Sequence, residues 1–388
     1  MARDVKKVLE AIDPLVVASA GKELDEVKAF ASIDCGSGDV EGNAQVVAQV
    51  DKMLSEIPGI EIRHIQTPTH GIMVAASLGK GNPNGKIILN AHMDTVFKKG
   101  DVAEHPFHVE GDKGYGLGSV DCKGGIVVAI NAVRILAEKN LLPDKEILFL
   151  FNNDEEIGST ECREHLIKEA EGAKAALVYE PSREDNGILT SRKGSVSFEI
   201  KCGGINSHSG NNYKGGASAV IELAKKIVYL YEHNDDEKGI QFNLVGIADG
   251  GKPSNILPDY AYCKGSVRFL SPEDLEYIKK TLEELKEVYI PGATTEVNIL
   301  NQGFAMDRTE ANVELYKFIK GIGEQIGYDL PEQTSGGSGD GAIFTTMGIP
   351  CVDALGPYMY KIHAYDESFR VSSIEEKTRL SCCILAMM

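Results

Sequence analysis

Histidine and carboxylate residues follow apolar runs at several places in this chain of 388 residues. In an open parallel sheet, ligands bind where the strands end, so residues directly after apolar runs are candidates for one shared site. Their side chains offer metal ligation and general acid–base chemistry. The candidates are His92 and Asp94, then Asp121, then Asp154, Glu155 and Glu156, and finally Glu180, with His363 from a later segment.

His92 and Asp94 are two residues apart, and in an extended segment such residues point to the same side. One ring nitrogen of His92 would then be free to bind a metal while Asp94 orients the ring through the other nitrogen. On its own a His-x-Asp pair is weak evidence, and the ordinary interpretation, a histidine without a metal, would prevail.

Asp121 lies in the glycine-rich segment 116–125, just before an expected helix. An N-cap aspartate is the ordinary interpretation, but the glycines also allow a close approach of the backbone. The segment is not a phosphate-binding loop, because it lacks the Walker spacing and the Lys-Ser/Thr pair.

The acids at 154–156 follow a strongly apolar run and would repel one another there unless a cation or a proton relieved their charge. In a solvated loop the same acids would be ordinary surface charge. Because adjacent side chains diverge, one of these glutamates can bind a metal while another faces a substrate and acts as the base for an attacking water. Glu180 and His363 are by themselves unremarkable.

As a set, the candidates comprise two histidines and several carboxylates without an obvious cysteine ligand. This donor set suits zinc, cobalt or manganese in an open catalytic site rather than in a structural one. Two divalent ions about 3.5–4 Å apart would need several anionic ligands, with one carboxylate shared between the two ions.

Alternating strands and helices are expected to position these residues. The apolar runs 86–91, 146–151 and 175–179 predict buried strands, and residues 124–139 have apolar positions at helical spacing. This alternation favours an α/β fold with a mostly parallel sheet covered by helices on both faces. The same pattern resumes near residue 310, and the sequence ends within an apolar helix.

Residues 195–304 show a different pattern. Strands are predicted at 195–202, 241–247, 260–269 and 294–299, with one helix at about 217–231 and another that begins after the N-cap Ser271. The order β-α-β-β-α-β is that of a ferredoxin-like unit. We therefore expect a catalytic domain made of 1–194 and 305–388, with an α+β domain inserted at 195–304.

The composition restricts the possible partners. Acidic residues number 58 against 40 basic ones, and the formal net charge is −18. Without a basic excess, nucleic acid and anionic membranes are not expected partners. The eight cysteines include no Cys-x-x-Cys pair and suit a reducing compartment. No apolar run approaches ~18 residues and the first 20 residues make a poor signal peptide, so we expect a cytoplasmic protein without a membrane span.

Taken in order, these motifs resemble those of the co-catalytic zinc peptidase family that includes aminoacylase, acetylornithine deacetylase, succinyl-diaminopimelate desuccinylase and glutamate carboxypeptidase. The resemblance extends from about residue 85 to 370. Five motifs in the family's order are far more specific than any single one. They are His92-Met93-Asp94-Thr95-Val96, Tyr115-Gly116 with Asp121 to Gly125, Asp154 to Gly158, Glu180-Pro181, and His363 with Glu367.

The resemblance implies that Asp121 bridges two divalent metal ions, which would be zinc, or alternatively cobalt or manganese. His92 and Glu180 would complete one site, and Glu156 and His363 the other.

The same resemblance implies that Asp94 orients His92 and that Glu155 is the general base. Glu155 would take a proton from the metal-bridging water and pass it to the leaving amine. In such families the peptide bond after the bridging aspartate, here Asp121–Cys122, is commonly cis.

The inserted domain resembles the family's lid, which also forms the dimer, so a homodimer through this domain is implied. His208 matches the lid histidine that stabilises the oxyanion from the neighbouring subunit. Asn255 and Arg268 match residues that hold the substrate carboxylate, for which the arginine fork is well suited. Lys193 is a further candidate for ligand contact. The ordinary interpretations are a surface-loop histidine and an exposed strand arginine.

The implied function is hydrolysis of an amide bond in short peptides with a free C-terminal carboxylate, as in glutamate carboxypeptidases and dipeptidases. An N-acyl amino acid deacylase is the alternative with the same chemistry. A scaffold protein that has lost catalysis is a third hypothesis, and the intact Glu155 argues against it. Leu117, where an arginine is usual, and the segment 211–214, which lacks the usual proline–glutamate pair, leave the substrate open.

Overall fold

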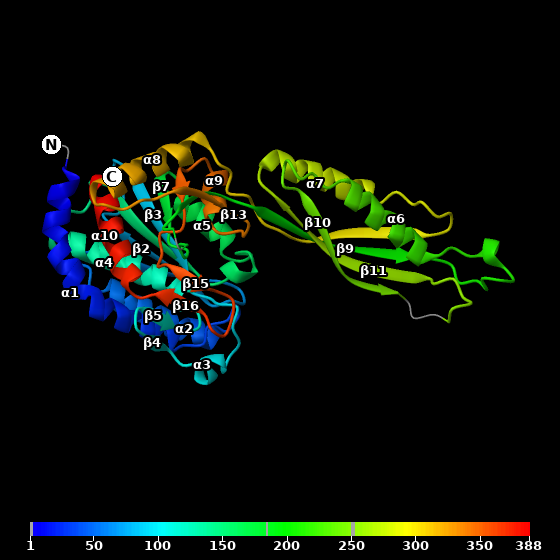
Figure 1. The fold of residues 1–388 in the computed structure, drawn as a ribbon, viewed down its shortest axis with the longest axis horizontal. Helices are drawn as coiled ribbons and strands as arrows, with labels where there is room; N and C mark the ends of the chain where they lie inside the picture. Colours follow the sequence, from blue (N-terminus) through cyan, green and yellow to red (C-terminus); the bar gives the residue numbers. More distant parts are fainter. Residues whose placement is uncertain (1–2, 184, 250–252) are drawn as a thin grey trace. The chain divides into compact units, whose positions relative to one another are not determined.

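The computed structural model describes residues 3–183, 185–249 and 253–388. The chain folds into two compact units (Figure 1). The first unit comprises Met1–Thr190, Arg308–Thr334 and Gly339–Met388, and the second comprises Ser191–Asp307 and Ser335–Ser338.

The first unit contains a six-stranded sheet with the order β1-β2-β6-β3-β7-β14. Strands β3, β6, β7 and β14 are parallel, whereas β2 runs antiparallel to its neighbours β1 and β6. The mostly parallel sheet predicted from the apolar runs is therefore confirmed. The strands are β1 (Glu61–Gln66), β2 (Ile72–Leu78), β3 (Lys86–His92), β6 (Glu146–Asn152), β7 (Ala173–Val178) and β14 (Cys351–Val352).

Helices flank this sheet. Helices α1 (Val5–Ala31), α4 (Gly125–Glu138) and α10 (Ser372–Met387) pack against one another, and α2 (Val40–Leu54) packs on β2 (Figure 1). Helix α1 continues through Pro14. The other helices of the unit are α3 (Asp101–Glu104), α5 (Arg163–Ala170), α8 (Glu310–Gln325) and α9 (Gly341–Thr346).

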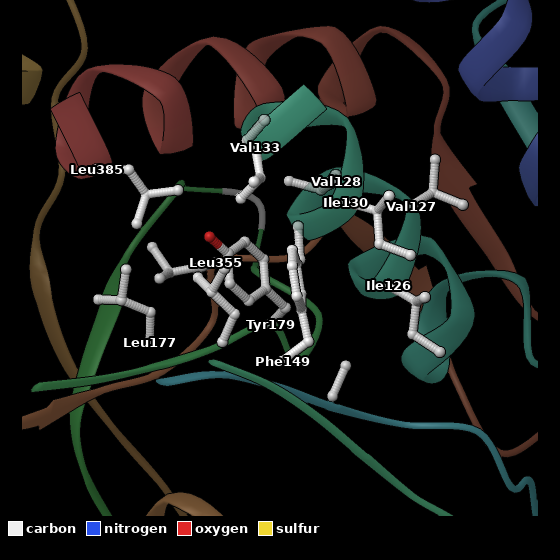
Figure 2. Close-up of a cluster of buried hydrophobic side chains, with 14 of the residues drawn as sticks. Ile126, Val127, Val128, Ile130, Val133, Phe149, Leu177, Tyr179, Leu355 and Leu385 are labelled. Carbon is white, nitrogen blue, oxygen red and sulfur yellow. The ribbon is translucent and has the colours of Figure 1, made fainter. Parts of the chain in front are cut away.

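The apolar core between α4 and the sheet holds the strand ends in place. Figure 2 shows Val128, Ile130 and Val133 of α4 around Phe149 of β6 and the ring of Tyr179. All of these side chains are fully buried. Residues 154–156 follow β6, and Glu180 follows Tyr179. This packing therefore also determines the positions of these candidate site residues.

Two small sheets complete the unit. The strand pair β8 (Ile188–Arg192) and β13 (Glu332–Ser335) forms one, and the order β15-β16-β5-β4 forms the other. In the latter, Ser368 pairs with Tyr115, which brings segment 362–367 beside segment 116–121 although some 250 residues of sequence separate them. Its strands are β4 (His108–Glu110), β5 (Lys113–Tyr115), β15 (Met359–Lys361) and β16 (Ser368–Arg370).

The second unit has the predicted order β-α-β-β-α-β, and its sheet order is β10-β11-β9-β12. Alternate residues of β9 are buried, and α6 and α7 pack on this sheet (Figure 1). Ser271 caps α7 in a capping box with Asp274, as the sequence indicates. The elements are β9 (Gly194–Gly203), α6 (Ala219–Glu232), β10 (Gln241–Asp249), β11 (Tyr260–Phe269), α7 (Pro272–Glu284) and β12 (Thr294–Gln302).

Two expectations from composition can be compared with the structure. All eight cysteines are buried and carry free thiols. In the part of the chain that the structure describes, no helix combines the length and apolar character needed to cross a membrane.

Replacing Phe149 by alanine should lower the free energy of unfolding by about 3–5 kcal/mol, because a fully packed aromatic ring would leave a cavity. Urea denaturation followed by circular dichroism measures this change. Val17→Ala on α1 is the matched control, since Val17 is 54% exposed and its truncation should change stability by less than about 0.5 kcal/mol. Equal losses in both variants would contradict the core position of Phe149.

Candidate metal centre

His92 ends β3, and its ring is buried and held by Asp94. The ring Nδ1 lies 3.0 Å from the Asp94 backbone oxygen and 3.3 Å from Asp94 Oδ1. If Nδ1 carries the proton and donates it here, the lone pair of Nε2 is free to bind a metal. Nε2 faces two carboxylates, at 3.1 Å from Asp121 Oδ1 and 3.4 Å from Glu180 Oε1.

His363 occupies the corresponding position on the other side of Asp121. Its Nε2 lies 3.0 Å from Asp121 Oδ2 and 3.3 Å from Glu156 Oε2. The side chain is 51% exposed, and its backbone has a left-handed φ of 56°. The two oxygens of Asp121 thus face two different histidines, and each histidine has one further carboxylate.

These separations fit two metal ions. Tetrahedral zinc with bonds of about 2.0–2.1 Å holds its ligand atoms roughly 3.3 Å apart. The four distances from histidine nitrogen to carboxylate oxygen are 3.0 to 3.4 Å. The donor set of imidazole and carboxylate also suits zinc, cobalt or manganese. The residues present therefore fit a pair of divalent ions that share Asp121.

The carboxylate of Asp94 links this cluster to the turn that carries the acids. Asp94 Oδ2 accepts hydrogen bonds from Ser37 Oγ at 2.6 Å and from the Glu156 amide at 3.2 Å. Asp94 Oδ1 accepts from the Glu155 amide at 3.1 Å. Residues Glu155–Ile157 form a 3₁₀ turn. One buried carboxylate therefore fixes both glutamates relative to His92.

Glu367 holds the backbone of the segment that leads to Asp121. Its buried carboxylate accepts hydrogen bonds from the amides of Gly118 and Val120, each at 3.0 Å, and from the Asp121 amide at 3.4 Å. Within this segment, Ser119–Gly124 forms a π-type turn and the Asp121–Cys122 peptide is cis, as the resemblance implied. The sequence placed Glu367 in a motif without assigning it a task, and the structure supplies one.

The electrostatics indicate a site that attracts cations. Hydrogen bonds to Asp121 and Glu156 raise the pKa of His363 to about 10. Burial opposes protonation of His92, but the surrounding acids still raise its pKa well above the usual value. Burial, together with the charge of Glu180, raises the pKa of Glu155. The carboxylates are therefore crowded enough to favour positive charge between them.

Cys122 also lies at this site, although the sequence had indicated no obvious cysteine ligand. His92, Cys122 and Glu180 form one group of mutually close donor atoms, and His92, Asp121 and Glu156 form another. However, the Cys122 thiol donates to the Tyr179 backbone oxygen at 3.1 Å, and burial raises the pKa of this thiol well above its usual value. A neutral, hydrogen-bonded thiol is a poorer ligand than the Asp121 carboxylate.

Asp340 lies in the glycine-rich segment 336–341, which also resembles a substrate-side loop of the family. Its buried carboxylate accepts hydrogen bonds from Ser159 Oγ at 2.5 Å and from Asn152 Nδ2 at 2.7 Å. Ser159 follows the turn of Glu155 and has a left-handed φ of 51°. Asp340 therefore supports the residues on either side of this turn, Asn152 before it and Ser159 after it.

In the second unit, His208 and Asn255 lie together. The ring Nδ1 of His208 accepts hydrogen bonds from the amides of Gly210 and Asn211, each at 3.1 Å. In the neutral ring, Nε2 must then carry the proton and act as a donor. This Nε2 lies 3.4 Å from the side-chain nitrogen of Asn255.

Arg268 and Lys193 form a second pair in the same unit. Arg268 donates to Ser338 Oγ at 3.3 Å, and Ser338 Oγ donates to the Lys193 backbone oxygen at 3.0 Å. The Lys193 ammonium donates to the Gly239 backbone oxygen at 3.1 Å. Both basic residues are thus tied to the segment 335–338.

Strand β11 separates these two pairs. Tyr260, at its start, pairs with Gly203 near the His208 loop, whereas Arg268 pairs with Ser195 at the other end. At about 3.3 Å per residue, the eight steps between Tyr260 and Arg268 span roughly 26 Å. The structure therefore brings His208 to Asn255 and Arg268 to Lys193, but it keeps the two pairs apart.

The shared carboxylate, the two histidines and the adjacent glutamates are features of a metal-dependent hydrolase. The chain matches the model of Peptidase family M20/M25/M40 over residues 88–386. It is 31% identical over 336 residues to carboxypeptidase G2 of Pseudomonas sp. (strain RS-16), an alignment that covers 84% of this chain and 79% of the relative. The chain therefore belongs to Peptidase family M20/M25/M40, a family of metallopeptidases.

Two solved structures share the fold. An aminopeptidase PepT from Bacillus cereus has a TM-score of 0.78 and 22% identity, with 95% of this chain and 98% of that chain covered. A Bacillus subtilis protein described as a dinuclear metal binding peptidase of the M20 family has a TM-score of 0.71 and 15% identity, with 95% and 98% covered.

Replacing Glu367 by alanine should weaken metal affinity by about 10–100-fold, because groups that hold a ligand in place typically contribute that much. The measurement is metal content after dialysis against a series of buffered zinc concentrations. Asp366→Ala is the control, since the neighbouring Asp366 side chain is 63% exposed and pairs with the side chain of Lys361. Unchanged affinity in the Glu367 variant would contradict its role in holding Asp121.

Proposed function

We propose that this protein is a zinc-dependent peptidase that cleaves the amide bond next to a free C-terminal carboxylate in short peptides, as a carboxypeptidase or a dipeptidase. The observation that carries this proposal is the pair of triads that share Asp121, with Glu155 beside them. The 31% identity to a carboxypeptidase supports the same substrate class.

The residues divide between two ions. His92, Asp121 and Glu180 would hold one, and Asp121, Glu156 and His363 would hold the other. When bound, such ions polarise the scissile carbonyl, stabilise the charge that develops on its oxygen and lower the pKa of water.

Glu155 is the proposed general base. The hydrogen bond from its amide to Asp94 fixes the backbone at the start of the turn. Its carboxylate would accept a proton from the attacking water and deliver it to the leaving amine. Glu156, the next residue, diverges from it toward His363.

Arg268 is the proposed partner of the substrate carboxylate, because a guanidinium can bind it through two parallel hydrogen bonds. Asn255 and Lys193 are the other proposed contacts. His208, with its donor at Nε2, would stabilise the oxyanion. Since β11 separates His208 from Arg268, one substrate can contact both only if they come from different copies of the chain.

We therefore propose a homodimer that forms through the second unit. Helix α6 of this unit has an exposed apolar face, which supports the proposal because such surfaces often mark interfaces. On this face Ile221 is 47%, Val228 55% and Tyr231 74% exposed.

Replacing Glu155 by glutamine should abolish turnover, because the amide accepts no proton from water. The variant should still bind two metal ions per chain, since Glu155 is not among the proposed ligands. A screen of dipeptides, tripeptides and N-acyl amino acids, with zinc or cobalt supplied and metal content measured on the same sample, provides both readouts. Full activity of the variant with bound metal would refute the proposed base.

The same screen decides the substrate class. A carboxypeptidase or dipeptidase should release a C-terminal amino acid from peptides with a free carboxylate and should not cleave their C-terminal amides. Release of acetate or succinate from N-acyl amino acids, with peptides left intact, would instead identify a deacylase. Dialysis against a chelator should remove the activity, and zinc or cobalt should restore it.

A mixed-dimer experiment tests the contribution of the neighbouring copy. His208→Ala and Glu155→Gln should each be nearly inactive alone. After co-refolding in equal amounts, about half of the dimers should be mixed, and each of these should contain one complete site. About a quarter of the wild-type activity should therefore return. No recovery in demonstrably mixed dimers would show that His208 does not act across subunits.

A further inference from the structure

A cavity of about 490 Å³ lies in the first unit directly beside the candidate metal ligand Glu156. Its size falls within the range of about 300–1,000 Å³ that is usual for small-molecule sites. Its apolar lining comes from Val96, Phe97 and Ile157. Val96 follows Asp94 by two residues and Ile157 follows Glu156 directly, so the lining is continuous in sequence with the metal centre.

Two apolar side chains of this lining are well exposed. Val96 is 44% exposed and Ile157 is 41% exposed. Single exposed apolar residues are common on protein surfaces, but two on one cavity wall beside a metal centre indicate a binding surface. The ring of Phe97 lies 6.0 Å from that of Tyr365, which follows His363 by two residues. These two aromatic rings therefore extend the apolar surface from the cavity toward the segment of His363.

Several polar side chains that line the cavity already form hydrogen bonds or ion pairs with other residues of the protein. Lys99 pairs with Glu41 at 2.5 Å, and Asp39 caps α2 by accepting from the Gly42 amide at 3.1 Å. Ser37 donates to Asp94. The surface left to a ligand is therefore mainly apolar, with the exposed Lys98 at its edge.

We propose that this cavity is the subsite for the group on the amino side of the scissile bond and that it selects a bulky apolar or aromatic side chain there. This inference rests on the proposed function. Residues of the first unit form the entire lining, whereas the residues proposed to hold the C-terminal carboxylate belong to the second unit. The cavity is therefore available to the other half of the substrate, next to Glu156.

The test compares kcat/KM for two peptides that differ only at this position, Phe-Xaa and Gly-Xaa, where Xaa is the C-terminal residue preferred in the substrate screen. Val96→Trp should fill the cavity and lower the ratio of Phe-Xaa to Gly-Xaa by about tenfold or more. Val96→Ala removes apolar contact without adding bulk, and it should lower the same ratio by about threefold. Val17→Trp, at an exposed position on α1, should leave the ratio unchanged.

The outcomes are distinguishable. If the wild type cleaves neither peptide nor any other tested amide, the proposed function fails and this inference fails with it. If the wild type cleaves both peptides and the ratio stays constant in both Val96 variants, the subsite is refuted while the proposed function stands. If Val96→Trp impairs both peptides equally, Val96→Ala decides, and an unchanged ratio in that variant refutes the subsite.

Discussion

The carboxylate of Asp121, with one oxygen facing His92 and the other facing His363, is the interaction on which the rest of the site depends. A carboxylate can serve two cations only if both of its oxygens are accessible, and this requires that its backbone be held firmly. Glu367 provides that support by accepting hydrogen bonds from the backbone amides of Gly118, Val120 and Asp121. The cost of burying several carboxylates together is offset only when positive charge lies between them.

The core and the site are connected through the strand ends. Strands β3, β6 and β7 are parallel neighbours, so the residues that follow them emerge at one edge of the sheet. The packing of Phe149 and Tyr179 against α4 fixes two of these ends (Figure 2). Asp94 then joins the end of β3 to the turn after β6 through its bonds to the Glu155 and Glu156 amides. The pairing of the strands and the hydrogen bonds of the Asp94 carboxylate together determine where the side chains of the site lie.

Elements with long apolar runs were predictable, whereas short ones were not. The buried strands at 86–92 and 146–152 and the helix at 125–138 follow directly from their hydrophobic patterns. Strand β4 has three exposed residues and carries no such pattern, yet its small sheet places His363 beside Asp121. A three-residue strand exists only because a neighbouring strand completes its hydrogen bonds, which no local signal records.

The sequence by itself determined the donor types, their order along the chain and the family, because these depend on residue identity and spacing. Tertiary structure alone decided which oxygen of Asp121 faces which histidine, that the Cys122 thiol bonds to a backbone oxygen, and that Glu367 supports the bridging segment. It also decided that Arg268 and His208 lie at opposite ends of β11. The physical reason is that these relations depend on strand register and on contacts between residues far apart in sequence.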